Sequence, residues 1–437
     1  MKEEFPAISV IIPTHNRDAM LRRILDALGA QTYPTERMEV LLVADGCTDG
    51  TMQMLRHYTA PFCLRMFEQP NQGPAGARNY GAARASGQLL VFLDDDIEAA
   101  PHLVQAHANA HHGRPGHVVL GYLPPVFQAQ SDFFYNSLRS WWEDVFFAMR
   151  QPGYRYSYRN LLSGNFSLEA KLFARVGGFD PAFRCHEDYE LGIRLIDAGA
   201  LFSFVPEALG LHHDRTDLKR LLQRKYEEGR ADVLIGLRHP KLRPVLSISR
   251  FSATQSRRTR VLRVLAFLSP GAGDMIAACW RSVLRILEWV RIRTYWRELF
   301  ELLLFYQYCR GLAKALGTRR ALAGFLQGVP ARDHETDVEI ELDLREGLAA
   351  AERRLNEERP AGVRLRYGRL PIGRIAPEIG AEKLRGGHLR PHLVTKLAWS
   401  FLQAITLESA TEPDGPSTMH PELSDRSAEM IYADKSA

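Results

Sequence analysis

Between residues 8 and 213, short apolar runs alternate with segments of helical periodicity. Residues 8–12, 39–44 and 89–93 are almost entirely apolar, which is typical of strands buried on both faces of a parallel sheet. Helices are expected between them, and the first would bury Leu21, Ile24, Leu25 and Leu28 and end at Gly29. This alternation predicts an α/β fold with a doubly wound, mostly parallel sheet, and such sheets bind ligands at the carboxyl ends of their strands.

A basic segment with helical periodicity follows, from residue 215 to residue 330. It contains 23 Lys and Arg against eight Asp and Glu, a local charge of +15 in a chain whose net charge is +5. Its apolar and aromatic residues recur at three- and four-residue steps, among them Leu262, Leu265, Trp280, Val283, Leu284, Leu287, Trp289, Trp296 and Leu299. Basic amphipathic helices with interleaved tryptophan suit an anionic membrane surface. A solvated helical face packed on the neighbouring domain fits the pattern equally well.

After residue 331 the pattern becomes that of a small α+β unit. Residues 338–344 alternate as a strand does, residues 349–358 predict a short helix, and residues 363–375 predict two strands about a turn at Gly368. From residue 409 the chain is polar, which predicts a disordered tail. The predicted units are therefore a sheet domain at 1–214, the basic helical segment at 215–330, an α+β appendage at 331–408 and the tail at 409–437.

The chain gives no signal for a membrane span or a disulfide framework. The nearest approach to a run of about 18 apolar residues, at 264–280, is interrupted by Pro270, two glycines and Asp274. The five cysteines are far apart and form no Cys-x-x-Cys pair, which favours a reducing compartment. Since the first residues also lack the apolar core of a signal peptide, a cytoplasmic location is expected, or a peripheral one on the inner face of the membrane.

The loops after the first two predicted strands carry short polar side chains. The first loop reads Pro13, Thr14, His15, Asn16, Arg17, and the second reads Asp45, Gly46, Cys47, Thr48, Asp49. Such side chains and the free backbone amides beside them can hydrogen-bond to a nucleobase and a ribose. They can also cap the helices that follow; capping is the favoured role for Asp49, and ligand binding is the favoured role for Asp45.

Two further loops carry charge. Residues 71–79 enter a predicted helix through two glycines and supply Arg78, and a helix N-terminus beside a cation can bind an anion. Residues 89–93 lead directly into Asp94, Asp95 and Asp96. Three adjacent carboxylates repel one another, and ion pairing or a divalent cation such as Mn²⁺ or Mg²⁺ would offset that repulsion. The sequence therefore predicts metal and nucleotide binding here.

In order and spacing, these loops together resemble those of the family 2 glycosyltransferases, which have the GT-A fold. The resemblance also includes Pro101, five residues after the three acids. It covers about the first half of the chain and thins out in the basic helical segment. It implies a nucleotide-diphosphate-sugar donor and transfer of the sugar to the hydroxyl of an acceptor glycan, lipid-linked glycan or metabolite, in the synthesis of a cell-surface glycan or glycoconjugate.

The resemblance implies roles for particular residues. By position, Asp45 reads the base, Asp94 is the first acid of an Asp-x-Asp motif, which holds ribose or a bridging water, and Asp96 is the last acid, which binds the metal. Asp95 stands between them and can share either task. The expected nucleotide-sugar site comprises Pro13, Thr14, Asn16, Arg17, Asp45, Gly46, Arg78, Asp94 and Asp95.

The resemblance extends to residues that would serve the acceptor side. The stretch at 162–180 matches the family's sequence after the metal motif and places Asn165 beside the sugar. The run from His186 to Gly192 matches a Glu-Asp motif, in which Glu187 contacts the acceptor or sugar and Asp188 is the general base that takes the acceptor's proton. Without the upstream motifs, these acids would be read as residues that favour a helix N-terminus.

Many relatives carry a histidine near the metal or the diphosphate at the position of His212. A neutral imidazole can complete a carboxylate metal shell, so His212 is a candidate metal ligand and His213 a second one. Two such histidines are equally often plain surface residues. The cofactor expected for this site is Mn²⁺ or Mg²⁺.

The expected reaction is a single displacement with inversion, in which the metal neutralises the leaving nucleoside diphosphate. Gln307-Tyr-Cys-Arg310 is followed by Gly311 rather than Trp, so the motif of processive synthases is absent and one sugar per encounter is expected. Two alternatives stay open: a sugar-nucleotide pyrophosphorylase, for which the loop at Pro13 is a poor match, and a membrane-surface adaptor with a vestigial transferase domain. No motif that reads nucleic acid accompanies the basic charge, so nucleic acid is not expected as a partner.

Overall fold

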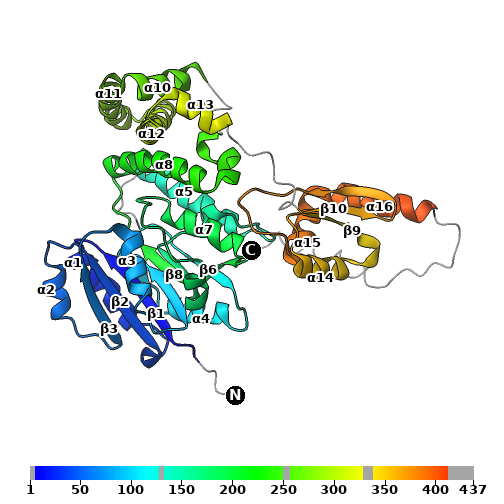
Figure 1. Ribbon diagram of the computed structural model, residues 1–437, viewed down its shortest axis with the longest axis horizontal. Helices are drawn as coiled ribbons and strands as arrows, with labels where there is room; N and C mark the ends of the chain where they lie inside the picture. The colour runs from blue at the N-terminus through cyan, green and yellow to red at the C-terminus, as the bar shows by residue number, and fades with distance from the viewer. Residues whose placement is uncertain (1–4, 127–131, 250–255, 328–337, 412–437) are drawn as a thin grey trace.

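The N-terminal half of the chain folds around one eight-stranded sheet (Figure 1). The structure is a computed structural model that describes residues 5–126, 132–249, 256–327 and 338–411. The strand order is β3-β2-β1-β4-β7-β6-β8-β5. The first four strands run parallel to one another: β1 (Ile8–Thr14), β2 (Met38–Asp45), β3 (Cys63–Gln69) and β4 (Leu89–Leu93).

The second half of the sheet is mixed. β7 is antiparallel to both β4 and β6, β8 is parallel to β6, and β5 is antiparallel to β8. The bounds are β5 (Ile97–Ala99), β6 (His117–Tyr122), β7 (Asn165–Glu169) and β8 (Leu201–His212). The predicted α/β fold with a mostly parallel sheet is therefore confirmed.

Every residue of β1, β2 and β4 is buried, as their apolar runs predicted. Phe92 on β4 stacks on Phe166 on β7, with ring centroids 4.8 Å apart, which joins the parallel and mixed halves of the core. The strand β3 was not predicted. It pairs only with β2 at the edge of the sheet, and because most of its residues are not buried it lacks a continuous apolar run.

Helices pack against the sheet, with α3 on β1 and β2 and α4 on β6 and β8. The helix predicted to end at Gly29 is confirmed as α1, and it buries the four residues expected of it. The helices of this domain are α1 (Asp18–Gly29), α2 (Thr51–Arg56), α3 (Gly73–Ala82), α4 (Leu103–His111), α5 (Phe133–Arg150), α6 (Ala170–Arg175) and α7 (Glu187–Asp197).

The basic segment is helical, as predicted. Its helices are α8 (Leu218–Arg238), α10 (Arg257–Leu268), α11 (Pro270–Trp289), α12 (Arg293–Leu316) and α13 (Arg319–Gln327). α8 and α12 pack closely, since a Cβ added at Gly311 would lie 1.9 Å from the backbone oxygen of Tyr226. One hydrophobic cluster joins Phe183 and Ile193 to Ile235 and Tyr308, so the core crosses the domain boundary predicted at residue 214. None of the described helices has both the length and the apolar character needed to cross a membrane.

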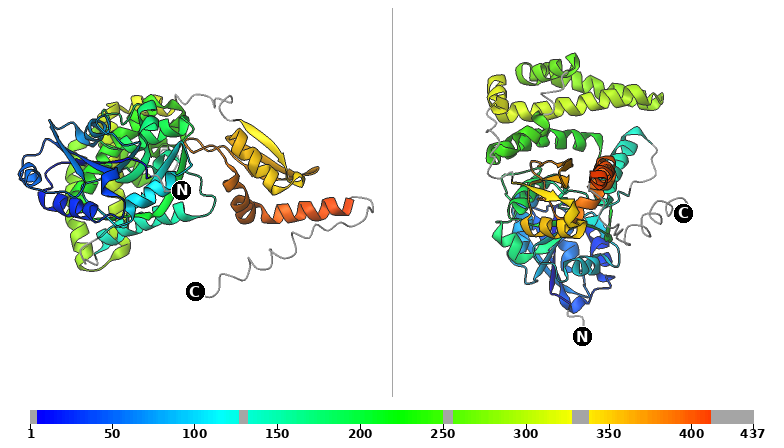
Figure 2. Two further views of the ribbon diagram at one scale, coloured as in Figure 1. Left: turned by 90° about the horizontal axis from the view of Figure 1, so that it is seen from below. Right: turned by 90° about the vertical axis from the view of Figure 1, so that its right-hand side faces the viewer.

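The appendage contains a separate three-stranded sheet, which lies away from the large sheet in Figure 1 and in the left view of Figure 2. The predicted strands are β9 (Glu339–Asp343), β10 (Gly362–Tyr367) and β11 (Leu370–Ile375), and the predicted turn at Gly368 has a φ of +61°. Arg155 anchors the unit by donating to the carbonyl oxygens of Ala361, Ala376 and Glu382.

The helices of the appendage were predicted only in part. α14 (Leu348–Glu358) was expected, whereas α15 (Leu389–His392) and α16 (Ala398–Thr411) were not. α16 runs into the first residues of the predicted tail, and the rest of that tail lies outside the described residues. Short 3₁₀ and π turns connect the elements of the chain at Thr35–Arg37, Tyr158–Asn160, Pro240–Val245, Leu344–Glu346, Gly386–His388 and Leu393–Leu397.

Candidate active site

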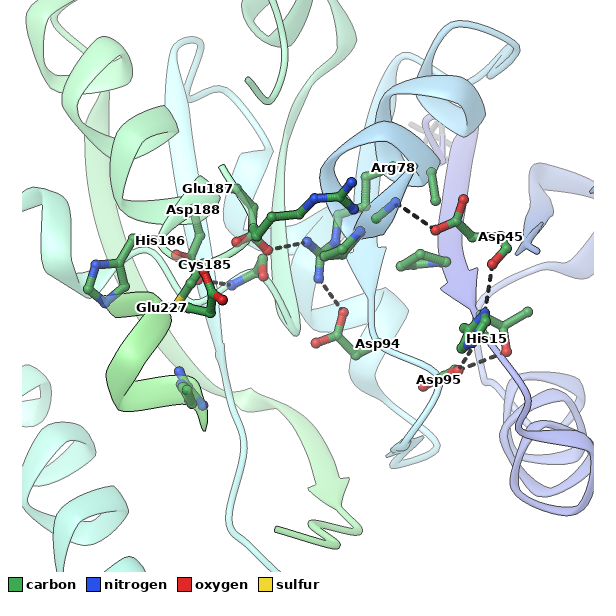
Figure 3. Close-up of a pocket in the computed structure, with 18 of the residues that line it drawn as sticks. His15, Asp45, Arg78, Asp94, Asp95, Cys185, His186, Glu187, Asp188 and Glu227 are labelled. Atoms are coloured by element: carbon green, nitrogen blue, oxygen red, sulfur yellow. Dashed lines mark hydrogen bonds and ion pairs between the residues drawn. The ribbon is translucent and has the colours of Figure 1, made fainter. Parts of the chain in front are cut away.

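A cleft of about 700 Å³ opens at the carboxyl ends of β1, β2 and β4. The loops after these strands line one wall, and residues of α7 and α8 line the other (Figure 3). A second hollow of about 310 Å³ adjoins it, and Asp94, Asp96 and Asp188 line both. Of the expected site residues, the cleft is lined by Pro13, Thr14, Arg17, Asp45, Arg78, Asp94, Asp95, Asp96, Glu187 and Asp188, and the second hollow by His212.

Asp45 holds the loop that opens α3. Its carboxylate accepts hydrogen bonds from the backbone amides of Gln72 and Gly73 and from the side chain of Gln69, all at 2.8 Å. Its carbonyl oxygen lies 2.7 Å from Nδ1 of His15. Glycine is favoured at position 73, because its φ is +83°, a conformation that L side chains rarely adopt. Asp45 therefore lines the cleft with its carboxylate already engaged, and its contact with a base stays a prediction.

Asn16 and Gly46 support the site from outside the cleft. The side-chain oxygen of Asn16 accepts from the amides of Thr48 and Asp49, so it ties the first loop to the second. Gly46 has a φ of +70°, and an added Cβ would lie 2.9 Å from Asn71. Neither residue is among those that line the two hollows, so the structure does not support the expected direct contact of Asn16 and Gly46 with a nucleotide.

Arg78 forms the centre of a buried ion-pair cluster. Its guanidinium donates to Asp94 at 2.6 Å and to Glu187 at 2.9 Å, and its side chain is 3% exposed. Burial alone would lower the pKa of Arg78, but the charges of Asp94 and Glu187 outweigh burial and raise it. The cation predicted to bind an anion is thus held by two carboxylates, and it joins α3 to the loop after β4 and to the start of α7.

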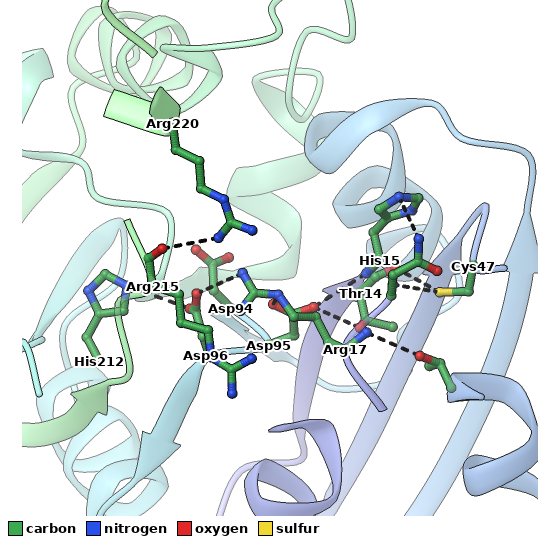
Figure 4. Close-up of polar contacts among 12 residues, drawn as sticks. Thr14, His15, Arg17, Cys47, Asp94, Asp95, Asp96, His212, Arg215 and Arg220 are labelled. Atoms are coloured by element: carbon green, nitrogen blue, oxygen red, sulfur yellow. Dashed lines mark hydrogen bonds and ion pairs between the residues drawn. The ribbon is translucent and has the colours of Figure 1, made fainter. Parts of the chain in front are cut away.

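The positive charge of Arg17 lies beside the other two acids of the loop after β4, Asp95 and Asp96. Arg17 lies 3.9 Å from Asp95 and 3.4 Å from Asp96, and the hydroxyl of Thr14 donates to Asp95 at 2.7 Å (Figure 4). Burial raises the pKa of Asp95 to about 6 despite the opposing charge of Arg17. Burial and the charge of Asp94 raise the pKa of Asp96 to about 7. The charges of neighbouring acids contribute to these raised pKa values, in agreement with the repulsion inferred from the sequence. Ion pairs with Arg17 and Arg78 offset part of that repulsion.

Asp96 and His212 have the chemistry of metal ligands. Nε2 of His212 lies 3.7 Å from Oδ1 of Asp96, and burial lowers the pKa of His212, which keeps the imidazole neutral. Nδ1 of His212 is buried and has no hydrogen-bond partner among the described residues. Carboxylate and neutral imidazole suit Mn²⁺, so these residues fit the expected metal.

The described residues do not form a complete metal shell, because no group of three or more His, Cys, Asp or Glu side chains among them is arranged to hold an ion. Substrate oxygens or water would supply the remaining ligands, as is common for Mg²⁺ sites. His213, the second candidate, instead lies 2.6 Å from Glu98. Glu98 also pairs with Arg23 at 2.7 Å, so His213 belongs to a hydrogen-bonded network centred on Glu98.

Asp188 stands at the start of α7, where both hollows meet. Its carboxylate accepts from the backbone amides of Tyr189 at 2.8 Å and Ser163 at 3.3 Å, which fixes its orientation. Burial raises the pKa of Asp188 to about 6, with the charge of Glu187 adding to the effect and His186 opposing it. A carboxylate with a pKa near neutrality has the property required of a general base.

Asn165 does not reach the cleft. Its side chain is 1% exposed, it lies 2.8 Å from His107 and donates to the carbonyl oxygen of Ala208, and Asn165 itself pairs with Leu93 inside the sheet. The expectation that Asn165 lies beside the sugar is therefore wrong, because a side chain with both ends bonded in the core cannot contact a ligand in the cleft.

The sequence analysis did not identify the residues that α8 contributes. Gln223, Arg224 and Glu227 line the cleft, and Arg220 lines the second hollow. Residues 220, 223, 224 and 227 are three or four positions apart, so they share one face of α8. That spacing is visible in the sequence, but no motif connects this face of the helix to the loops of the sheet.

Comparison with known proteins finds similarity to glycosyltransferases over the N-terminal half of the chain. The protein-family model described as "Glycosyl transferase family 2" matches residues 9–177. A second family model, described as "N-terminal domain of galactosyltransferase", matches residues 143–216. Validoxylamine A glucosyltransferase of Streptomyces hygroscopicus subsp. limoneus is 37% identical over 243 residues, which is 48% of this chain and 53% of that protein. Glycosyltransferase AglE of Haloferax volcanii is 28% identical over 240 residues, 54% of this chain and 76% of that protein.

Among solved structures, a mannosyltransferase from Pyrobaculum calidifontis in complex with GDP-Man and Mn²⁺ aligns with a TM-score of 0.48 at 19% identity, over 72% of this chain and 88% of that one. The match to the two validoxylamine glucosyltransferases spans only about half of their length. The matched segments contain the loops after β1, β2 and β4 and the Glu187-Asp188 pair. The N-terminal sheet domain of the chain is therefore similar to glycosyl transferase family 2 over residues 9–177.

Proposed function

We propose that this chain is an inverting glycosyltransferase that moves one sugar at a time from a nucleotide-diphosphate donor to an acceptor hydroxyl. The observation that carries the proposal is the meeting of two acidic groups in one cleft. The acids at 94–96 follow β4, whereas Asp188 comes from the start of α7, and both line the same 700 Å³ space. The match of residues 9–177 to glycosyl transferase family 2 and the glucosyltransferase activity named for a relative support the same function.

Some residues of the cleft would bind the donor, and others would act on the acceptor. The loops at Thr14, Asp45 and Asn71 would receive the nucleotide, because they lie at the carboxyl ends of parallel strands. Asp188 would accept the proton of the acceptor hydroxyl as its oxygen attacks the sugar. Asp96 and His212 would hold Mn²⁺ or Mg²⁺, which when bound neutralises charge on the diphosphate.

Thermal unfolding should reveal the donor. A ligand present at about a hundredfold excess over its Kd stabilises the native state by about 2.7 kcal/mol. We therefore expect one of UDP, GDP and dTDP to raise the unfolding temperature in the presence of Mn²⁺, and the effect to be lost in Asp96→Ala. CMP, a monophosphate, is the comparison and should have no such effect. Asp197→Ala, which removes an exposed acid on α7, is the matched control and should keep it. A folded protein that responds to none of the nucleotides would refute the donor site.

The activity should show an acidic limb near pH 6. Asp188 must be deprotonated to act as base, and burial raises its pKa to about 6, so kcat/KM should fall as the pH drops through that value. An ordinary aspartate would give a limb near a pH of about 4. Glu187→Gln removes a neighbouring negative charge and should move the limb to lower pH. The profile is measured at saturating Mn²⁺, which keeps Asp96 ionised; a limb near pH 4 in the wild type would contradict the role of Asp188.

A further inference from the structure

α11 turns an apolar face to solvent. The exposed residues are Met275 (72%), Val283 (40%), Ile286 (58%), Trp289 (83%) and Val290 (41%), of which Val290 is the C-cap that directly follows the helix. We call these five residues the α11 stripe. They recur at helical steps, and Cys279, also exposed, fills the gap between the first two. The stripe is therefore a continuous surface along about four turns of helix.

The core of the helical segment does not need this face. α11 packs inward through Gly273, Ala277 and Leu284, which are buried against α10 and α12. An added Cβ at Gly273 would lie 2.3 Å from the hydroxyl of Tyr306, so this inner face is packed as closely as the backbone allows. α11 therefore packs against α10 and α12 through its inner face. The stripe takes no part in the packing of the described residues. Large exposed apolar patches of this kind mark interaction surfaces.

Unpaired arginines surround the stripe. Arg285 adjoins Ile286 on α11, and Arg293 begins α12 just after the stripe ends. Neither forms an ion pair within the part of the chain that the structure describes. Figure 1 shows α10 and α11 at the end of the molecule remote from β1–β3, so the large sheet does not cover this face.

We propose that the α11 stripe binds an anionic lipid surface, with Trp289, Ile286 and Met275 inserted among the lipid chains and Arg285 and Arg293 beside the headgroups. An apolar helical face with a large aromatic side chain and flanking arginines is the pattern of helices that lie in a membrane interface. The stripe is a convex helical face, which can insert into lipid. Symmetric pairing of two copies through it would bring the same arginines together, and like charges oppose that arrangement. The proposal does not depend on the activity proposed above.

The test is flotation of the full chain with vesicles of phosphatidylcholine alone and with added phosphatidylglycerol. The wild type should float with the phosphatidylglycerol vesicles and much less with phosphatidylcholine alone. The triple variant Met275→Gln, Ile286→Gln, Trp289→Gln should lose binding, about tenfold or more for each apolar side chain removed. Arg285→Gln with Arg293→Gln should lower binding about fivefold for each charge, and only with the anionic vesicles.

Two controls separate this surface from others. Trp399→Gln on α16 removes a tryptophan that is 80% exposed and should leave flotation unchanged. All of these side chains are exposed, so the variants should unfold at the wild-type temperature. Failure of the wild type to float, equal flotation of the triple variant, or loss of flotation in Trp399→Gln would overturn the proposal. Self-association of the wild type without lipid that the triple variant abolishes would also overturn it, since the stripe would then join two copies.

Discussion

Replacing Asp188 with asparagine is expected to lower kcat by about 10²- to 10⁴-fold, the usual contribution of a positioned general base. Asparagine has nearly the same shape, and its single side-chain oxygen can keep the shorter bond from the amide of Tyr189, whereas the longer bond from Ser163 is lost, so most of the local structure should persist. The main loss is the ability to take a proton. The donor-side residues after β1, β2 and β4 are untouched, and nucleotide binding should therefore remain close to that of the wild type.

The measurement is kcat with the donor that the thermal screen identifies, together with the Kd of the matching nucleoside diphosphate. Asp197→Asn is the matched control, because Asp197 ends the same helix but pairs with Lys241 at the surface. Asp188→Asn with kcat within a few fold of the wild type would exclude Asp188 as the base. A parallel loss of nucleotide binding would assign Asp188 to the donor site instead.

The largest effect on stability is expected from Arg78→Met. Removal of one partner from a buried ion pair typically costs about 3–5 kcal/mol, because the charge left behind has lost both its solvent and its partner. Arg78 serves two carboxylates, and the side chain of Glu187 is 10% exposed, whereas that of Asp94 is 35% exposed and can be hydrated. We therefore expect a loss of about 3 kcal/mol in the free energy of unfolding, near the lower end of that range.

Urea denaturation of the full chain would measure this loss through the transition of the sheet domain. Arg84→Met is the control, since Arg84 is an exposed arginine just beyond the same helix and should change stability by less than about 1 kcal/mol. The double variant Arg78→Met, Glu187→Gln should recover part of the loss, because it removes one of the two stranded charges. If Arg78→Met were no more destabilising than Arg84→Met, the cluster would not hold the cleft together.

The strands that the sequence predicts are those in which every residue is buried. β1, β2 and β4 are buried on both faces, so each leaves a continuous apolar run that can be recognised without knowing its neighbours. The edge strand β3 and the outer helix α16 have mixed surroundings, and their patterns were not recognised. The pattern of apolar and polar residues therefore predicts burial only for a helix or strand that has the same surroundings along its whole length.

Prediction of the site succeeded where topology alone brings residues together. The carboxyl ends of neighbouring parallel strands meet at one edge, so Thr14, Asp45 and Asp94 had to lie close to one another once the strands were identified. The family resemblance added Asp188, which no local pattern connects to that edge. These features follow from the order of the residues along the chain.

Only the tertiary structure decided which charges and polar groups are paired. Arg78 meets Glu187 across 109 positions of sequence, and Asn165 meets His107 across 58. Such contacts depend on the order of the strands in the sheet and on the packing of α3, α4 and α7, which no local pattern specifies. The sequence by itself therefore determined the resemblance to family 2 glycosyltransferases, the sheet and the acids of the cleft. The fold decided that Arg78 binds carboxylates, that Asn165 belongs to the core and that one face of α11 is left open to solvent. The physical reason is that the residue type determines which interactions a side chain can form, whereas the distances to its partners in the fold determine which of them it forms.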